Sequence, residues 1–156
     1  MSAAAIPDAS RHSPRQRWMA ALARARADEI AAGLDRAGGL PAHRRLRGPE
    51  TGLVMVRGRI GGGGDAFNLG EMTATRCTVQ TECGHVGHAY VAGRDARQAE
   101  LAALADALLQ DPARHEAMMR TVVQPLADAQ QARANTTARK AAATQVKFFT
   151  LATMRS

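Results

Sequence analysis

Four side chains that can bind zinc or take part in nucleophilic catalysis lie within 12 positions of the sequence: Cys77, Cys83, His85 and His88. Their spacing, C-x5-C-x-H-x2-H, matches none of the common structural zinc motifs. A thiolate of either cysteine could instead pair with His88. Equally, the alternating strand pattern around Cys77 would turn its thiol toward the core, as is usual for a free cysteine. The sequence leaves metal binding, a thiolate pair and ordinary packing open, and it favours packing.

A second group of polar residues adjoins the predicted strands and turns: Asn68, Glu71, Arg76, His88, Arg94 and Asp95. Asp95 precedes a helical pattern and has a glutamine three residues on, so we predict that it caps that helix. Arg94 could pair with Glu71 across the sheet or bind a phosphate, and both interpretations stay open. These six side chains are the candidates for contact with a ligand or with another protein.

The glycine run Gly61 to Gly64 invites comparison with phosphate-binding loops. A Walker loop requires a lysine directly after its last glycine, and neither Lys140 nor Lys147 follows a glycine. A Rossmann loop requires a helix directly after the glycines, whereas residues 67–81 have a strand pattern. The run is therefore predicted to join two strands, either as a plain hairpin connection or as a loop that closes over a ligand.

The elements that position these residues begin with a helix at Ser13, which is followed by Pro14 and, three residues on, by Gln16. Glycines 38 and 39 end the helix. A rough apolar stripe runs along it, made of Trp18, Leu22, Ala25, Ile30 and Leu34. Residues 41–51 are predicted to be a basic loop, and residues 1–12 a disordered lead.

Four segments have strand character: residues 53–60, 69–81, 86–92 and 146–153. The four-residue connector before Val86 predicts that the second and third strands form a hairpin. Helical patterns follow Asp95 and Asp111, and Pro125 should end or kink the second of these helices. This order predicts an α+β fold, with a mostly antiparallel sheet of about four strands packed with three to four helices.

Large apolar side chains are scarce. The chain has 156 residues, 34 of them alanine and only five aromatic. Residues 127–145 contain nothing apolar larger than alanine, so they are predicted to form a helix that is either exposed or packed tightly against another chain. The adjacent Phe148 and Phe149 point to opposite faces of the last predicted strand. A thin core favours a partner that completes it, although closely packed alanine-rich helices would explain the same composition.

The net charge of +7 is concentrated in the first 60 residues, and 19 of the 21 basic residues are arginine. Such a segment suits nucleic acid, a polyphosphate ligand or an acidic protein surface. No run approaches the roughly 20 apolar residues of a membrane span, and the first residues lack the apolar run of a signal peptide. Two cysteines do not make a disulfide scaffold, so a cytoplasmic location is expected.

Several segments, taken in their order and spacing, resemble the PhnG family. They run from about residue 15 to residue 153 and comprise RWM at 17–19, ETGLV at 50–54, FNLGEMT at 67–73, TRC at 75–77, GHAYV at 87–91, GRD at 93–95, AE at 99–100, LADAL at 104–108, and KAAAT with V and FFT at 140–150. The resemblance implies a single domain over residues 13–156. It also implies a subunit of the carbon–phosphorus lyase core complex of bacterial phosphonate metabolism.

The resemblance further implies that the chain assembles with PhnH, PhnI and PhnJ, two copies of each, and that PhnL- and PhnK-type proteins associate with the complex. The implied reaction joins ATP and an alkylphosphonate, such as methylphosphonate, into α-D-ribose 1-phosphonate 5-triphosphate and releases adenine. No catalytic residue is carried over, because none is assigned to this subunit. We therefore expect an accessory subunit that is inactive alone, and that binds no cofactor or metal while ATP is a substrate of the complex.

Two other classes of protein stay open at this point. One is a nucleic-acid-binding module formed by the arginine-rich residues 11–59, although a single aromatic residue among those arginines offers little base stacking. The other is a small self-sufficient enzyme built around Glu71, His88 and Arg94. We expect neither nucleic acid nor a membrane as a partner, and we expect the isolated chain to be poorly soluble or oligomeric.

Overall fold

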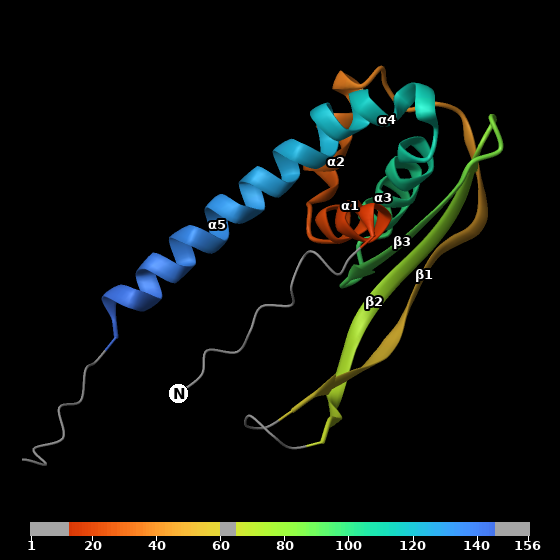
Figure 1. Cartoon of the computed structure of the whole chain (residues 1–156). Coiled ribbons are helices and arrows are strands. Elements are labelled where there is room, and N and C mark those ends of the chain that lie inside the picture. Colours follow the sequence, from red (N-terminus) through yellow and green to blue (C-terminus); the bar gives the residue numbers. More distant parts are fainter. Residues whose placement is uncertain (1–12, 60–64, 146–156) are drawn as a thin grey trace, which may run out of the picture.

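The computed structural model describes residues 13–59 and 65–145, and it has helices on one face of a three-stranded antiparallel sheet (Figure 1). The strands are β1 (His43–Gly58), β2 (Phe67–Thr81) and β3 (Val86–Ala92), in the order β1-β2-β3. The helices are α1 (Pro14–Ala23), α2 (Ala27–Arg36), α3 (Ala96–Leu109), α4 (Pro112–Met118), the π-helical turn η2 (Met119–Val123) and α5 (Gln124–Ala143). The predicted α+β class is confirmed.

Three predicted features lie outside the described residues: the lead at 1–12, the glycine turn at 61–64 and the fourth strand at 146–153. The described part thus contains three strands, and it contains five α-helices rather than three to four.

The first predicted helix is two helices, which corrects the interpretation of residues 13–37. The apolar stripe steps by five residues from Ala25 to Ile30, which is out of helical phase, and the chain breaks between α1 and α2 at that step. The amide of Gln98 in α3 donates to the carbonyls of Ala23 (3.2 Å) and Ala25 (2.6 Å). The break therefore lets the apolar residues of both helices face the core, and Gln98 of α3 pairs with the backbone carbonyls that the break leaves without helical partners.

The predicted basic loop at 41–51 is also wrong, because β1 begins at His43. Register shifts between Arg45 and Arg47, and between Arg47 and Glu50, accommodate the extra residues of this segment. Pro49 lies in the second shifted stretch, on an edge strand, where its missing N–H does least harm. A bulged strand lacks the strict alternation on which strand prediction depends, and this is why the segment has the composition of a loop.

The β2–β3 hairpin is confirmed. Thr81 N–H donates to the carbonyl of His85 (3.0 Å), and Gly84 has a φ of +88° in the connecting turn. Alternate residues of β2 face the helices, as the sequence pattern predicts, and Thr75, Cys77 and Val79 are buried there. We call this the inner face of the sheet and the opposite one the outer face.

Helix α3 is the central element of the core. Asp95 caps it by accepting from Gln98 N–H (2.9 Å), as predicted. Its residues 101–109 are all buried, a wider surface than the predicted stripe, because sheet and helices contact it from several sides. Gly87 of β3 lies directly against α3, because an added Cβ there would overlap with the Ala103 carbonyl oxygen. The helix therefore packs on β3 backbone to backbone.

Pro125 marks a change in the helical path, as predicted. It lies just after η2, and it cannot donate to the carbonyl of Thr121 four residues earlier. Arg36 Nη2 donates to that carbonyl (3.3 Å) from α2. Beyond the π-helical turn, α5 continues to Ala143, and its residues from 131 onward are exposed. The alanine-rich segment is therefore a helix with solvent around its second half.

Two parts project from the rest of the described structure, which we call the body (Figure 1). One is the second half of α5. The other, which we call the arm, comprises residues 53–58 of β1 and 67–73 of β2, where the two strands pair only with each other because β3 reaches no further along β2 than Ala74.

Candidate functional site

Arg76 and His88, two of the six predicted residues, lie close together on the outer face of the sheet. Arg76 is opposite Tyr90, and its Nη2 is 3.0 Å from a carboxylate oxygen of Glu50. Arg47 Nε donates to the same oxygen (2.9 Å). The hydrogen bond from Arg47, followed by that from Arg76, lowers the pKa of Glu50. This arrangement leaves one net positive charge on an open surface that can meet an anion or a partner.

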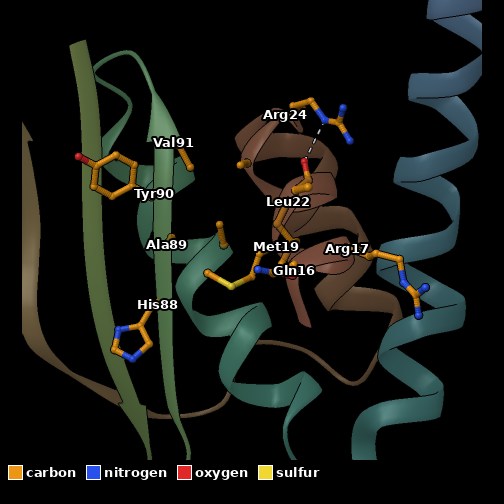
Figure 2. A pocket seen from close by; sticks show the side chains of 12 residues that line it. Gln16, Arg17, Met19, Leu22, Arg24, His88, Ala89, Tyr90 and Val91 are labelled. Atoms are coloured by element: carbon orange, nitrogen blue, oxygen red, sulfur yellow. Dashed lines mark hydrogen bonds between the residues drawn. The ribbon is translucent and has the colours of Figure 1, made fainter. Parts of the chain in front are cut away.

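His88 is beside this cluster, but its polar atoms are engaged in the fold. Its Nδ1 is 3.1 Å from Thr78 Oγ1, and its backbone N–H donates to Asp106 Oδ2 (2.9 Å). The ring points away from the helices, as does the half-exposed ring of Tyr90 two residues on (Figure 2). An exposed imidazole that bonds only to a threonine hydroxyl has no carboxylate to orient it as a general base.

The other four predicted residues lie elsewhere. Asn68 and Glu71 belong to the exposed arm, whereas Arg94 and Asp95 form the junction between β3 and α3. Among the ion pairs of residues 13–59 and 65–145, Arg94 and Glu71 form none, because Glu71 is opposite Met55 and beyond the end of β3. The six residues therefore do not converge on one pocket.

The four zinc-competent residues are not brought together either. Cys77 is buried on the inner face and Cys83 is exposed in the turn. Burial raises the pKa of the Cys77 thiol, which disfavours a thiolate there. In the described part of the chain, no group of three or more His, Cys, Asp or Glu side chains is arranged to hold a metal ion. The packing interpretation of Cys77 is confirmed.

Asp106, which is not among the predicted site residues, accepts hydrogen bonds from several elements of the body. Its carboxylate is fully buried and accepts from Arg15 Nη2 (2.7 Å), Trp18 Nε1 (2.9 Å) and the N–H of His88. Its hydrogen bond and charge raise the pKa of the Arg15 guanidinium. One carboxylate thus joins α1, β3 and α3, and an aspartate inside the otherwise apolar run LADAL was the signal for it.

Glu100 joins β1 to α3 in a similar way. It accepts from Arg45 Nε (2.7 Å) and Nη2 (2.8 Å), and His43 Nε2 is 3.3 Å away. The hydrogen bond from Arg45 is the main cause that lowers the pKa of Glu100, and the one from His43 adds to it. Several arginines of the first 60 residues therefore hold the fold together, rather than forming one basic patch.

An apolar groove of about 550 Å³ lies between α1 and β3 (Figure 2). Ala89 and Val91 point toward it from β3, whereas His88 and Tyr90 point to the other side. Met19 and Leu22 of α1 contribute its opposite wall. Its lining is mainly apolar, with Gln16, Arg17 and Arg24 at the margin. The groove lacks the convergent polar groups of an enzyme site and suits an apolar side chain of a peptide.

The arm carries five exposed large apolar residues, which are Leu53, Met55, Phe67, Leu69 and Met72. Leu53 and Met55 lie on its inner face, and a register shift between Val56 and Arg57 separates them from Leu69 and Phe67. Leu53 is 65% exposed and Leu69 is 55% exposed. A two-stranded ribbon is at best marginally stable on its own in water, and a contiguous apolar patch marks an interaction surface. The arm is therefore the strongest candidate in the described residues for contact with another protein.

No helix among the described residues has the length and apolar character needed to cross a membrane.

Comparison with known proteins agrees with the sequence resemblance. The family model described as phosphonate metabolism protein PhnG matches residues 13–154. A protein of Rhizobium meliloti (strain 1021), the alpha-D-ribose 1-methylphosphonate 5-triphosphate synthase subunit PhnG, is 44% identical over 151 residues, which cover 97% of this chain and 96% of that protein. The chain therefore belongs to the PhnG family of phosphonate metabolism proteins.

Proposed function

We propose that this chain is the PhnG-type accessory subunit of an α-D-ribose 1-methylphosphonate 5-triphosphate synthase. The observation that carries the proposal is the exposed apolar surface of the arm, in a chain 44% identical to a subunit of that synthase. Its predicted site residues are dispersed over the outer face, the arm and the β3–α3 junction. This suits a subunit that supports a reaction whose reacting groups another subunit supplies.

The reaction of the complex would replace adenine on ATP with an alkylphosphonate such as methylphosphonate. PhnI, PhnH and PhnJ are the proposed partners, with two copies of each, and PhnL- and PhnK-type proteins would associate with them. In this proposal the chain acts in the cytoplasm, holds no cofactor of its own, and meets ATP only as a substrate of the complex. Arg76 and Arg94 are its candidates for contact with a phosphate or a partner carboxylate.

The arm gives the proposal a sharp test. The double variant Leu53→Asp/Leu69→Asp places two charges on the apolar surface of the arm. Both side chains are exposed, so each substitution should change the free energy of unfolding by less than about 0.5 kcal/mol. Co-expression with PhnI followed by pull-down should show at least a tenfold loss of captured PhnI, because burial of an unpaired charge in an interface is costly. Adenine release from ATP and methylphosphonate by the reconstituted complex should fall in parallel.

Leu40→Asp is the matched control, since Leu40 is 52% exposed but precedes β1 and lies off the arm. It should leave capture and adenine release unchanged. Unaltered capture by the arm variant, or equal losses in both variants, would remove the arm as the interface. Adenine release by the purified wild-type chain alone would overturn the accessory role.

A further inference from the structure

We propose that the groove between α1 and β3 receives residues 146–153 from a second copy of this chain, which add a strand to the free edge of β3. The proposal concerns contact between two copies, and it does not depend on the synthase reaction.

The edge of β3 is satisfied along only half of its length. Gly93 N–H donates to Thr73 and Thr81 N–H to His85, so the odd-numbered residues of β3 bond to β2 and the even-numbered residues point outward. At the Val86 end, α3 covers the edge: Gln110 Nε2 donates to the Val86 carbonyl (2.8 Å) and Asp106 accepts from His88 N–H (2.9 Å).

At the other end of β3 the outward groups are open. Tyr90 N–H and its carbonyl make no hydrogen bond within residues 13–59 and 65–145. The apolar groove lies along this open half, and its lining includes Ala89 and Val91 of the strand itself. An added strand would therefore find backbone partners at Tyr90 and an apolar surface for its inward side chains, which is the arrangement of β-strand addition.

The chain contains a segment that fits this edge. Residues 146–153 read VKFFTLAT, a strand-type sequence with adjacent aromatic residues. Because neighbouring side chains of a strand alternate in direction, either register sends one of Phe148 and Phe149 into the groove. The other would lie on the outer face beside Tyr90, whose ring is 52% exposed and can pair with it across the strands.

The direction of α5 determines which copy provides the segment. Gln130 Nε2 donates to the Ala21 carbonyl (2.8 Å), which fixes α5 against α1 at that point. Ala143 lies about 20 Å further along the helix at 1.5 Å per residue. From Gln145 the next four residues can span at most about 14 Å, and α1 lies between α5 and β3 (Figures 1 and 2). Phe148 and Phe149 therefore fall short of their own groove and can fill that of another copy.

The projecting helix supplies what an exchange between copies requires. Residues 131–145 are exposed and carry no large apolar side chain, so the body does not hold them. A helix of this kind acts as a spacer that delivers its end to a neighbour, and reciprocal exchange in a two-fold pair would satisfy both edges at once.

A disulfide trap tests the contact in the full chain with Cys83 replaced by serine. One preparation carries Tyr90→Cys, and a second carries either Phe148→Cys or Phe149→Cys. After mixing and mild oxidation, one of the two phenylalanine variants should form a disulfide with the Tyr90→Cys chain, because cross-strand neighbours meet the required Cα separation. The other should not, since its side chain enters the groove. A Leu40→Cys chain, with a thiol at an equally exposed position, is the control that should remain uncoupled.

Light scattering of the purified chain provides an independent readout. The wild type should show the mass of two copies, and Tyr90→Pro should show that of one, because proline removes the outward N–H while the ladder to β2 stays intact. Tyr90→Thr keeps that N–H and should retain the two-copy mass. Phe148→Asp/Phe149→Asp should abolish it.

Three results would overturn the proposal: a single-copy mass for the wild type, no disulfide between the Tyr90→Cys chain and either phenylalanine variant, or a two-copy mass that survives Phe148→Asp/Phe149→Asp. In the complex co-purified with PhnI, a disulfide from the Tyr90→Cys chain to another subunit would assign the groove to a different protein. The arm variant Leu53→Asp/Leu69→Asp should leave the two-copy mass unchanged, which separates this contact from the proposed synthase interface.

Discussion

The two halves of β2 differ in burial although they belong to one strand. Val79 is fully buried, whereas Leu69, ten residues earlier in the same strand, is 55% exposed. Helix α3 covers Val79, and no described element covers Leu69. Leucine is as apolar as valine, so the difference arises from the neighbours that the fold provides.

This contrast separates stability from assembly. In the described body, the buried side-chain polar atoms are paired except Gln130 Oε1, and small residues let backbones approach closely, so most changes should cost folding free energy. In the arm, apolar side chains are exposed and Gly70 faces open space, so most changes should cost association instead. Each of the following substitutions tests that division.

The largest effect is expected at Asp106. Asp106→Ala leaves the indole N–H of Trp18 and the backbone N–H of His88 without an acceptor in a buried site, which should lower the free energy of unfolding by about 3 kcal/mol. Urea denaturation of the purified chain measures it. Asp106→Asn retains one acceptor oxygen and should lose less. A change below about 1 kcal/mol for the alanine variant would mean that the carboxylate does not hold the three elements together.

A matched pair of glycines compares the two halves directly. Gly87→Ala places a methyl group against the backbone of Ala103 and Ala107, and it should destabilise the chain by about 1–3 kcal/mol as α3 is forced away. Gly70→Ala in the arm meets nothing within 4 Å and should be neutral or slightly stabilising. Thermal unfolding of both variants measures the difference. Similar shifts in Tm for Gly87→Ala and Gly70→Ala would contradict the division between body and arm.

The smallest effect is expected at Glu100, and it appears in the dependence of Tm on pH. Its pKa is lower in the folded chain than its ordinary value of about 4.3. The contribution of Glu100 to the free energy of unfolding is therefore complete above that value, and it is lost as the pH falls through the folded-state pKa. Glu100→Gln should flatten the decline of Tm between about pH 5 and pH 3, at a cost at neutral pH below about 1 kcal/mol. Arg45→Gln should flatten it similarly, and a wild-type slope in both variants would exclude the pair as its cause.

Much of the fold was predictable because its signals are local. The cap at Asp95, the short connector of the β2–β3 hairpin and the alternation through Thr75, Cys77 and Val79 each depend on neighbouring residues. The errors came where another element satisfies the chain: Gln98 makes the break after Ala23 possible, and β2 supports the bulged, basic half of β1. The candidate site was less predictable, since the six polar residues share strands and turns but not one location.

The sequence by itself determined the family, the α+β class and the helical character of the alanine-rich segment, because motif order, strand alternation and capping are properties of neighbours along the chain. Only the tertiary structure decided that Asp106 is a buried junction, that β3 has a half-covered edge beside an apolar groove, and that the arm exposes its leucines. Burial depends on which distant segments meet, and one aspartate or leucine has the same chemistry in a core as on a surface.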